Sequence, residues 1–586
     1  MSSVFSRIVS RAKPSPTAPP SLVDASNRAG HKLTKPDEAF LKELDGRLRH
    51  RDRPAVAVLG GPRSAWLPRA LDEAHPRARV QHFDATSIGR SQLHAHLAGN
   101  GPFDVIVDDT RRGRGRARLL RDVFFHLRPG GALVIRNFRA KPQGGVPGTP
   151  NEDVSALVSR LVALKAQEPP EVAESVESMK DERTQVQRDE QQLASAIGRV
   201  VVDAQHVLLT NRVRAFAKVR EDEMDTILEL RAPRSGRVLE SRPPLEFASR
   251  CTLRQNAKER GRAMPTTYQV PAVSLREYYD VVCAPGQVVV QDDLLLPDTY
   301  RHNQRKRLRN LYTEELSPLS ATPLVDVSHP EALAGTYFYL DSEFRGHFGH
   351  AMTEVLSRLW AWPQAKEANP ALKAVMALNK GREIAGFEKA IFAAAGIDPD
   401  DLVLVRGPVR IEKLIAATPM LSMPEYVHPD IAATWDVVGK ELASLAPARD
   451  YPTRVFCSRR IDKRPCHNAA EVESLFSSHG FEVIYPEDYP LAEQAMIFRQ
   501  AEVIAGFAGS GLFTLCLTGA PKRVLMISSE LYIARNEYLI ASVLGHEIDL
   551  VTCKADSSGP GHVTHSGFTF DFDREGAYLQ DVLTSL

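Results

Sequence analysis

As far as about residue 230, short apolar runs alternate with amphipathic stretches, and this pattern predicts a sheet interleaved with helices. Two further runs within 199–210 surround a turn and predict an antiparallel hairpin that ends the sheet. Strands that alternate with helices are typical of parallel sheets. The strands expected before the hairpin are 55–59, 79–83, 103–107 and 132–135, and the expected helices are 65–75, 92–97, 119–127 and 154–166.

A second alternation of the same kind runs from about residue 245 to the end of the chain and predicts two more Rossmann-like lobes. A stretch at 231–244, rich in Pro, Arg, Gly and Ser, marks the boundary before it. The predicted fold class is therefore α/β throughout. The predicted organisation is a flexible tail at 1–35, a Rossmann-like domain at 36–232 with a polar helical insertion near 167–195, an N-lobe at 233–445 and a C-lobe at 446–586.

Composition excludes several classes of protein. The 74 basic and 73 acidic residues nearly cancel, so no global field favours nucleic acid, and none is expected as a partner. The six cysteines form no C-x-x-C pair, which argues against a disulfide framework or zinc site and fits a reducing compartment. No apolar run approaches a membrane span. We expect a cytoplasmic protein; residues 1–13 form either a frayed tail or a basic amphipathic helix that touches the inner face of the membrane.

Phosphate chemistry is indicated after two strands of the C-lobe. One strand ends at Ser458, and a basic group follows it; a later strand ends at Gly506, and a glycine-rich turn then opens a helix. Arginine forks and helix N-termini at the carboxyl ends of parallel strands bind diphosphates, although a solvated loop and a tight turn are the alternatives. The candidate residues are Ser458, Arg459, Arg460, Lys463 and Arg464 in the first group and Gly509, Ser510, Gly511 and Leu512 in the second.

Candidate acid–base residues lie in the N-lobe. His347, His350 and Glu354 are spaced at i, i+3 and i+7, so a helix over 347–360 would present them on one face. His350 or Glu354 can then serve as the general base. A metal site and a histidine bound within the core are the alternatives; no metal is predicted, because no third strong ligand follows at metalloenzyme spacing. Asp341 is a reserve candidate for the base, with Glu343 beside it.

The order of these motifs resembles glycosyltransferase family 61 over roughly 250–586. The resemblance rests on SRR at 458–460, GFEVIYPED at 480–488, EQAMIF at 493–498 and GHFGHAMTEVLSRLW at 346–360. It differs in one loop: 508–514 reads AGSGLFT, where the family usually has His-Gly-Ala-Gly-Leu-Thr-Asn.

The family resemblance implies a GT-B-type, inverting transfer from a nucleotide sugar to a hydroxyl of a glycan or lipid-linked glycan. It also implies that Glu493 and Gln494 contact ribose or sugar hydroxyls, although a favourable helix start explains Glu493 equally well. A UDP-sugar is the expected donor, with Mg²⁺ compatible but not required. The expected setting is bacterial surface polysaccharide synthesis. The sequence indicates no particular oligomeric state.

The N-terminal domain resembles a class I methyltransferase through the phrases FDVIVDD at 103–109 and LRPGGALVI at 127–135. Its first turn is only Gly60-Gly61-Pro62, without the usual acidic residue and G-x-G, and one βα unit is absent after Asp84. Asp84 either binds a ribose hydroxyl or caps the next helix. We therefore expect a structural copy that does not use S-adenosylmethionine. The alternatives for the whole chain are a bifunctional methyltransferase–glycosyltransferase and a non-catalytic scaffold of a glycan assembly complex.

Overall fold

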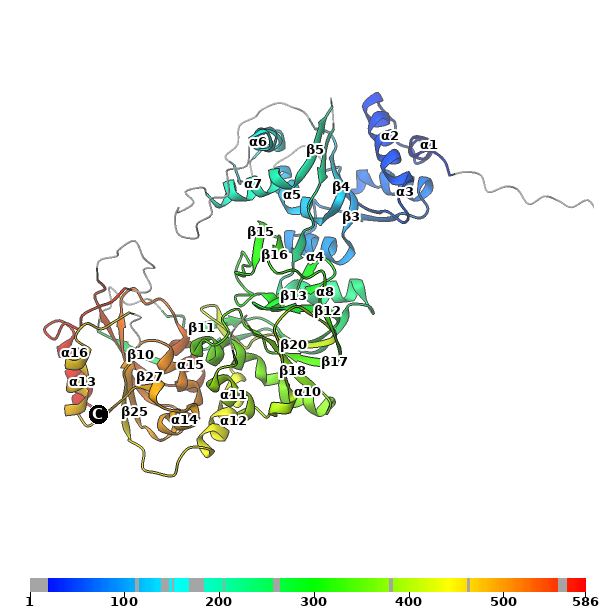
Figure 1. The fold of residues 1–586 in the computed structure, drawn as a ribbon. Helices are drawn as coiled ribbons and strands as arrows, with labels where there is room; N and C mark the ends of the chain where they lie inside the picture. The colour runs from blue at the N-terminus through cyan, green and yellow to red at the C-terminus, as the bar shows by residue number, and fades with distance from the viewer. Residues whose placement is uncertain are drawn as a thin grey trace, which may run out of the picture. The chain divides into compact units, whose positions relative to one another are not determined.

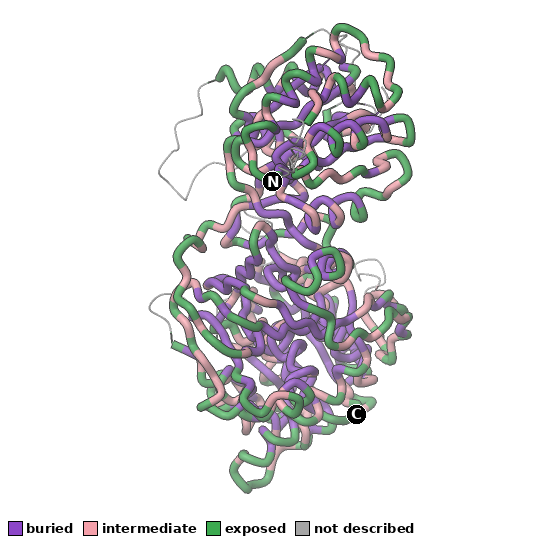
Figure 2. Tube along the Cα trace, turned by 90° about the vertical axis from the view of Figure 1, so that its right-hand side faces the viewer, coloured by how far each residue is buried: buried purple, intermediate pink, exposed green. Residues whose placement is uncertain are grey.

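The computed structural model divides the chain into two compact units. Unit 1 comprises 1–217 and 316–320, and unit 2 comprises 218–315 and 321–586. Figure 2 shows buried segments running through each unit and exposed segments along its surface. The structure describes residues 19–110, 115–138, 147–149, 152–167, 184–203, 206–256, 264–378, 383–460, 464–556 and 566–586. The predictions for 1–13, for Lys463 and for most of the polar insertion therefore lie outside the described residues.

Unit 1 is an α/β domain with one mixed sheet in the order β2-β1-β3-β4-β6-β5. β2, β1, β3 and β4 are parallel, and the predicted hairpin appears as antiparallel β5 and β6. The strands are β1 (Ala55–Leu59), β2 (Arg79–Phe83), β3 (Phe103–Asp108), β4 (Leu127–Ile135), β5 (Ile197–Val202) and β6 (Val207–Asn211). The helices are α1 (Leu22–Arg28), α2 (Lys35–Arg49), α3 (Trp66–Ala74), α4 (Arg90–Asn100), α5 (Arg116–Val123), α6 (Val154–Ala166) and α7 (Gln185–Ala196).

Helices cover both faces of this sheet (Figure 1). Val56 and Val58 of β1 face a core with α1, α2 and α3, whereas Ala57 and Leu59 face a second core with α5, α6 and α7. Successive residues of a strand point to opposite faces, so a strand buried on both sides must be apolar throughout. α1 is a correction to the predicted tail at 1–35: its Leu22 and Ala25 are fully buried. Only α4 joins β2 to β3, so no strand lies between them.

Unit 2 contains two large sheets and one long shared core. The first sheet includes, in order, β14, β13, β12, β20, β17, β18 and β19, with β8 beside β12. The second is wholly parallel, in the order β10-β27-β26-β25-β23-β24. Phe338 of the first sheet, Trp435 of α12 and Ile504 of the second sheet belong to the same hydrophobic cluster. The α/β fold class is thereby confirmed for both units.

The elements of unit 2 follow the predicted alternation closely. Its strands are β8 (Gly236–Arg242), β9 (Leu245–Ala248), β10 (Thr252–Gln255), β11 (Thr267–Val270), β12 (Val273–Ala284), β13 (Val288–Gln291), β14 (Leu294–Leu295), β17 (Glu331–Tyr339), β18 (Lys373–Ala377), β19 (Leu402–Val405), β20 (Val409–Ala417), β21 (Leu421–Ser422), β22 (Tyr426–Val427), β23 (Arg454–Cys457), β24 (Glu482–Ile484), β25 (Val503–Phe507), β26 (Arg523–Ser529) and β27 (Glu547–Cys553). Its helices are α8 (Glu221–Arg231), α9 (Phe348–His350), α10 (Trp362–Ala368), α11 (Gly386–Ala394), α12 (Ile431–Ser444), α13 (Ala469–Ser478), α14 (Leu491–Gln500), α15 (Asn536–Leu544) and α16 (Gly576–Thr584). The chain passes between the units within β7 (Phe216–Lys218), β15 (Thr313–Ser317) and β16 (Ser320–Pro323).

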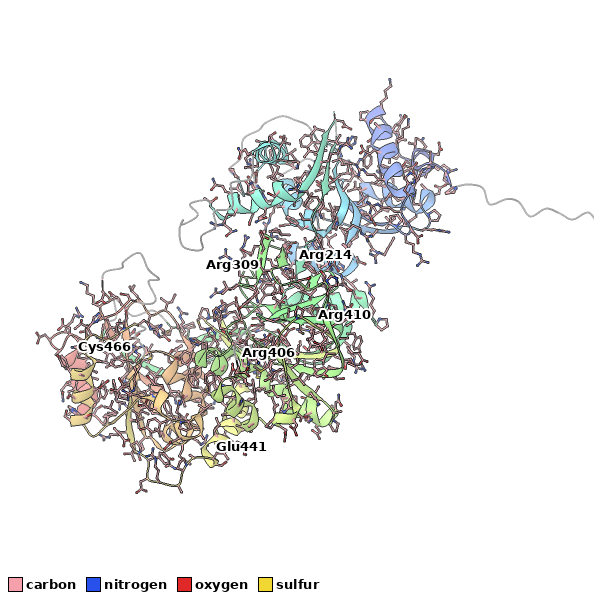
Figure 3. The ribbon with its side chains drawn as sticks, viewed as in Figure 1. Arg214, Arg309, Arg406, Arg410, Glu441 and Cys466 are labelled. Atoms are coloured by element: carbon pink, nitrogen blue, oxygen red, sulfur yellow. The ribbon has the colours of Figure 1, made fainter. Side chains whose placement is uncertain are left out.

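Two segments belong to a different unit or sheet from the one that the predicted domain boundaries imply. α8 falls in unit 2, because the buried Glu221 carboxylate pairs with Arg276 and accepts a hydrogen bond from Thr418. β10 precedes the first sheet in the chain, yet it pairs with β27 at the edge of the second sheet. Exposed arginines of unit 2 are also paired at the surface: Figure 3 labels Arg406 and Arg410, which contact Glu383 and Asp280.

Candidate functional site

A cavity of about 220 Å³ in unit 2 is lined by loops and helices that follow strands of both large sheets, and by the hairpin of β21 and β22. Several polar atoms around it are buried and have no hydrogen-bond partner among the described residues, which is unusual, since buried polar groups are nearly always paired. These atoms are His302 Nδ1, Glu354 Oε2, Arg464 Nε and Asn536 Oδ1. The residues that line the cavity are Arg301, His302, His347, Gly349, His350, Thr353, Glu354, Leu421, Ser422, Met423, Arg464, Ser510, Phe513, Tyr532, Ala534 and Asn536.

Two arginines lie together beyond the end of β23, and one of them, Arg464, lines the cavity. Arg459 follows the end of β23, donates to the Ala508 carbonyl at 3.3 Å and stacks over Phe507. Arg464 lies over the Tyr532 ring, 4.6 Å from its centroid. Neither guanidinium has a carboxylate within ion-pair distance among the residues that the structure describes. Burial, followed by the charge of Arg464, lowers the pKa of Arg459 to about 10, so an anion beside the two arginines would relieve both effects.

Gly509 brings its loop against both arginines. Its φ of 148° is a conformation that side chains rarely adopt, and a Cβ there would lie 3.1 Å from Arg464 Nη2 and 3.5 Å from Arg459 Nη1. The Gly509 N–H donates to Glu537 Oε1 at 2.8 Å. The backbone amide that the sequence predicted to bind phosphate is therefore hydrogen-bonded to a side chain of the protein. Ser510 lines the cavity, whereas Leu512 is fully buried in the core. The helix opened at 510–517 is a 3₁₀ helix.

The start of α15 also borders the cavity, and the sequence reasoning missed it. Glu537 is buried, and Tyr532 donates its hydroxyl to Glu537 Oε1 at 3.1 Å. Burial raises the pKa of Glu537 to about 7, although the Gly509 N–H and Tyr532 hydroxyl oppose the shift. Asn536 is 8% exposed. Both residues follow β26. Because ligands are expected beyond the carboxyl ends of parallel strands, this position in the chain could have identified them as candidates.

The predicted acid–base residues also line the cavity. His350 Nδ1 lies 2.8 Å from Glu354 Oε1, and Arg301 Nε donates to the same oxygen at 3.0 Å. Arg301 Nη2 also lies 3.3 Å from His350 Nδ1, but the shorter carboxylate contact assigns the Nδ1 proton to Glu354. His350 Nε2 is then the proton acceptor. His347 packs edge-on against His350 at 4.7 Å.

The segment 347–360 is not the single α-helix that we predicted. It passes from α9 into a π-helical turn at Ala351–Val355 and a 3₁₀ helix at Leu356–Ala361. π turns inside helices occur frequently at functional sites. Gly349 lets this segment approach the 3₁₀ helix at 510–517, since a Cβ there would lie 3.1 Å from the Phe513 ring and 3.2 Å from Ser510 Cβ.

Burial and neighbouring charges determine the protonation states of Glu354 and His302. Burial tends to raise the pKa of Glu354, but the hydrogen bond from His350 and the charge of Arg301 outweigh it, and the pKa is lowered. Glu354 is therefore a carboxylate at neutral pH. Burial lowers the pKa of His302 to about 4, with the charges of Arg301 and Arg305 acting in the same direction. His302, a neutral imidazole, was not a candidate from sequence.

Several candidate residues, Arg459 and Gly509 among them, are not among the residues that line the cavity. Asp341 is 2% exposed and accepts a hydrogen bond from the Ser342 N–H, and burial raises its pKa to about 7. Because Asp341 is enclosed in the core, it cannot reach a ligand there. The remaining candidates have other partners in the structure: Ser458 with Glu473, Arg460 with Asp488 and Tyr485, Glu493 with Arg449, and Gln494 with the carbonyls of Pro486 and Tyr489. Gly511 lies near Pro486.

Ion pairs occupy the carboxyl ends of the parallel strands in unit 1. Asp84 accepts hydrogen bonds from the N–H and hydroxyl of Thr86, as a cap does. Beyond β3, Asp109 pairs with Arg136 at 2.9 Å, and Arg136 also pairs with Asp37 at 2.7 Å. Arg136 is 4% exposed, so the protein's own side chains fill this position.

Two classes of site are not found in the described part of the chain. No group of three His, Cys, Asp or Glu side chains there is arranged to hold a metal ion. Among the same residues, no helix has the length and apolar character needed to cross a bilayer.

Comparison with known proteins gives one family match. The model of glycosyltransferase family 61 ("Glycosyltransferase 61") matches residues 348–525. The predicted resemblance to this family is confirmed over that segment, which begins beside His350 and includes Arg459, Arg464 and Gly509. The match supports glycosyltransferase activity for unit 2. No curated protein matches the chain.

Two solved structures are similar to parts of the chain. One is the MycE methyltransferase from the mycinamycin biosynthetic pathway in complex with Mg, SAH and mycinamycin VI: 15% identity, TM-score 0.25, covering 33% of this chain and 55% of that one. The match thus spans about half the length of that methyltransferase. The other is the dodecameric iron-containing heptosyltransferase TibC in complex with ADP-D-beta-D-heptose: 12% identity, TM-score 0.21, covering 45% of this chain and 77% of that one.

Proposed function

We propose that unit 2 is an inverting glycosyltransferase of GT-B type, which moves a sugar from a nucleotide sugar to a hydroxyl of a glycan or lipid-linked glycan. One observation carries the proposal: Arg464 lines the cavity beside Arg459, and the His350–Glu354 pair lines the same cavity. Among the residues that the structure describes, neither arginine has a carboxylate partner. The family match includes all four of these residues. A phosphate-bearing leaving group needs cationic side chains, and a hydroxyl nucleophile needs a general base.

The donor diphosphate binds at Arg459 and Arg464. Hydrogen bonds between arginine and phosphate are charge-assisted and strengthen as the leaving oxygen gains charge. The cavity is smaller than the roughly 300–1,000 Å³ of most ligand sites, so it holds the diphosphate and sugar while the nucleoside lies outside. Asn536 Oδ1 and Glu354 Oε2, which lack partners, accept hydrogen bonds from hydroxyl groups. We expect a UDP-sugar, with Mg²⁺ tolerated but not required.

The acceptor hydroxyl is deprotonated by His350. Its Nε2 takes the proton while Glu354, held by Arg301, stabilises the imidazolium that forms. The acceptor oxygen then bonds to the anomeric carbon as the bond from that carbon to the phosphate oxygen breaks. The nucleoside diphosphate leaves toward Arg459 and Arg464, on the side opposite to the nucleophile, so the anomeric configuration inverts.

For unit 1 we propose a structural role without S-adenosylmethionine. The Asp37–Arg136–Asp109 network supports this, because ligand binding there would have to break a buried ion pair. Calorimetric titration of the full chain with S-adenosylmethionine tests it, and heat of binding would instead favour a bifunctional enzyme. All six cysteines are free, which supports a cytoplasmic setting, and we place the reaction in bacterial surface polysaccharide synthesis.

The proposal is tested by donor turnover in matched arginine variants. Hydrolysis of UDP-sugars by the purified chain is expected to fall about 100-fold or more in Arg459→Ala, the size of effect seen when one transition-state donor is lost. Arg460→Ala is the control, because Arg460 is exposed and pairs with Asp488. It should remain within about 3-fold of wild type. Full turnover in Arg459→Ala would overturn the diphosphate site, and no turnover in any form would favour a scaffold.

A further inference from the structure

A second opening in unit 2 lies beside the cavity. It has a volume of about 530 Å³, within the usual range for ligand sites. Its floor contains the buried Val270 and Tyr426, and its rim carries exposed polar side chains. We name it the side groove. Its lining residues are Pro244, Leu245, Glu246, Gln269, Val270, Pro271, Gln304, Glu425 and Tyr426.

Two chain segments line both openings. Met423 lines the cavity and Glu425 the side groove; both lie in the hairpin of β21 and β22. Likewise, His302 lines the cavity and Gln304 the side groove. Residues two apart in a chain are at most about 7 Å apart at Cα, so the linings of the two openings come close to each other at two separate places. A chain whose end enters the cavity beside His302 can therefore continue into the side groove.

The lining chemistry excludes a strongly anionic ligand. No Lys, Arg or His is among the lining residues, whereas two carboxylates and two carboxamides are. Glu425 Oε2 is buried and has no hydrogen-bond partner in the described part of the chain, and burial raises the pKa of that carboxyl. Carboxylate and amide oxygens accept hydrogen bonds from hydroxyl groups, and the Pro, Leu and Val surfaces suit the C–H faces of sugar rings.

In the nearby basic cluster at 301–309, each arginine lies within 4 Å of a carboxylate of unit 2, which weakens the attraction of the cluster for an anionic ligand. Arg301 pairs with Glu354 at 2.7 Å, and Arg305 lies 3.6 Å from Glu425. Arg307 and Arg309 share Glu315, at 3.0 and 3.3 Å. An acidic glycan would have to displace these pairs.

We infer that the side groove binds an uncharged stretch of the acceptor glycan, next to the sugar that receives the transferred residue. The inference rests on the proposed glycosyl transfer and names the class of its acceptor. The acceptor end lies at His302 and His350, and the preceding neutral sugars lie against Gln304, Gln269 and Glu425.

Binding of the full-length chain to an array of neutral and acidic bacterial oligosaccharides tests the inference. Neutral oligosaccharides should bind, and the double variant Gln269→Ala/Gln304→Ala should weaken that binding at least 10-fold. Gln500→Ala, an exposed glutamine of α14 that is not among the groove's lining residues, should bind as wild type does.

Hydrolysis of the UDP-sugar is measured on the same wild-type and Gln500→Ala preparations, and both should hydrolyse it at the same rate. This readout separates the two proposals: absent hydrolysis in wild type speaks against the transferase, not the groove. Preference for acidic glycans, no binding of any neutral glycan, or unchanged binding by the double variant would each overturn the inference.

Discussion

The buried Glu537 carboxyl should make the stability of unit 2 depend on pH in one defined window. Its side chain is 1% exposed and accepts hydrogen bonds from Gly509 and Tyr532, yet burial dominates and raises its pKa from 4.5 to about 7. A raised pKa in the folded state means that the folded protein holds this proton more tightly than the unfolded chain does. The contribution to stability is therefore complete below about pH 4.5 and is lost as the pH rises through 7.

The magnitude follows from the shift. The difference between 7 and 4.5 is about 2.5 pH units, and at 1.36 kcal/mol per unit the loss is about 3 kcal/mol between pH 4 and pH 8. Glu537→Gln removes the titration and keeps an oxygen to accept from the Gly509 N–H. The variant should therefore gain about 3 kcal/mol relative to wild type across this range. Asp341 titrates in the same window but is present in both proteins, so it cancels.

Urea unfolding at half-unit steps of pH, followed by tryptophan fluorescence, measures this difference. Three of the four tryptophans (Trp360, Trp362 and Trp435) lie in unit 2, so the signal reports mainly on that unit. Glu482→Gln is the control, because Glu482 is exposed on β24 and its surroundings change little on unfolding. A difference between Glu537→Gln and wild type that stays flat from pH 4 to 8, or that falls, would refute the reasoning.

Three further predictions concern the cavity. UDP should bind more tightly at pH 6 than at pH 8 by calorimetry, because charged Glu537 repels the diphosphate; Glu537→Gln should reduce this pH dependence, and an equal dependence would contradict the prediction. Gly509→Ala should lower UDP affinity at least 10-fold, since its φ and contacts exclude a Cβ, whereas Gly511→Ala should bind normally in the same titration. In transfer assays, His350→Gln should reduce kcat about 100-fold or more with little change in donor KM, while Asp341→Asn should retain wild-type kcat; the reverse order would assign the base to Asp341.

Much of the fold was predictable because its strands are buried on both faces. A run such as 55–59 must be apolar at every position, and the helices between such runs must be amphipathic, so the pattern shows both. β10 was not predictable in this way: it is four residues long and only partly buried, and its partner β27 lies almost 300 residues later in the chain. The break of 347–360 into a π turn was equally hidden, because apolar spacing does not distinguish hydrogen-bond registers within one helical segment.

The candidate site was predictable where one motif contributes the chemistry. Arg459, Gly509, His350 and Glu354 were identified by residue type and position. The sequence could not distinguish Arg459 from Arg460. In the structure, Arg459 contacts the loop of Gly509, whereas Arg460 pairs with Asp488. Adjacent side chains at a strand end point in different directions, and the sequence does not show which one points toward the site. Gln494 was misleading for a similar reason: its side-chain amide donates to the carbonyls of Pro486 and Tyr489, which precede α14.

By itself, the sequence determined the α/β class, the alternation of most strands and helices, the likeness to family 61 and the residue types available for phosphate and proton chemistry. These are local properties, set by side-chain polarity and by spacing along the chain. The tertiary structure decided that Arg301, His302, Tyr532 and Asn536 join the cavity, that Asp341 does not, and that a carboxylate already holds the Gly509 amide. Such facts depend on which distant segments meet and on which charges lose water, and no short stretch of sequence encodes either.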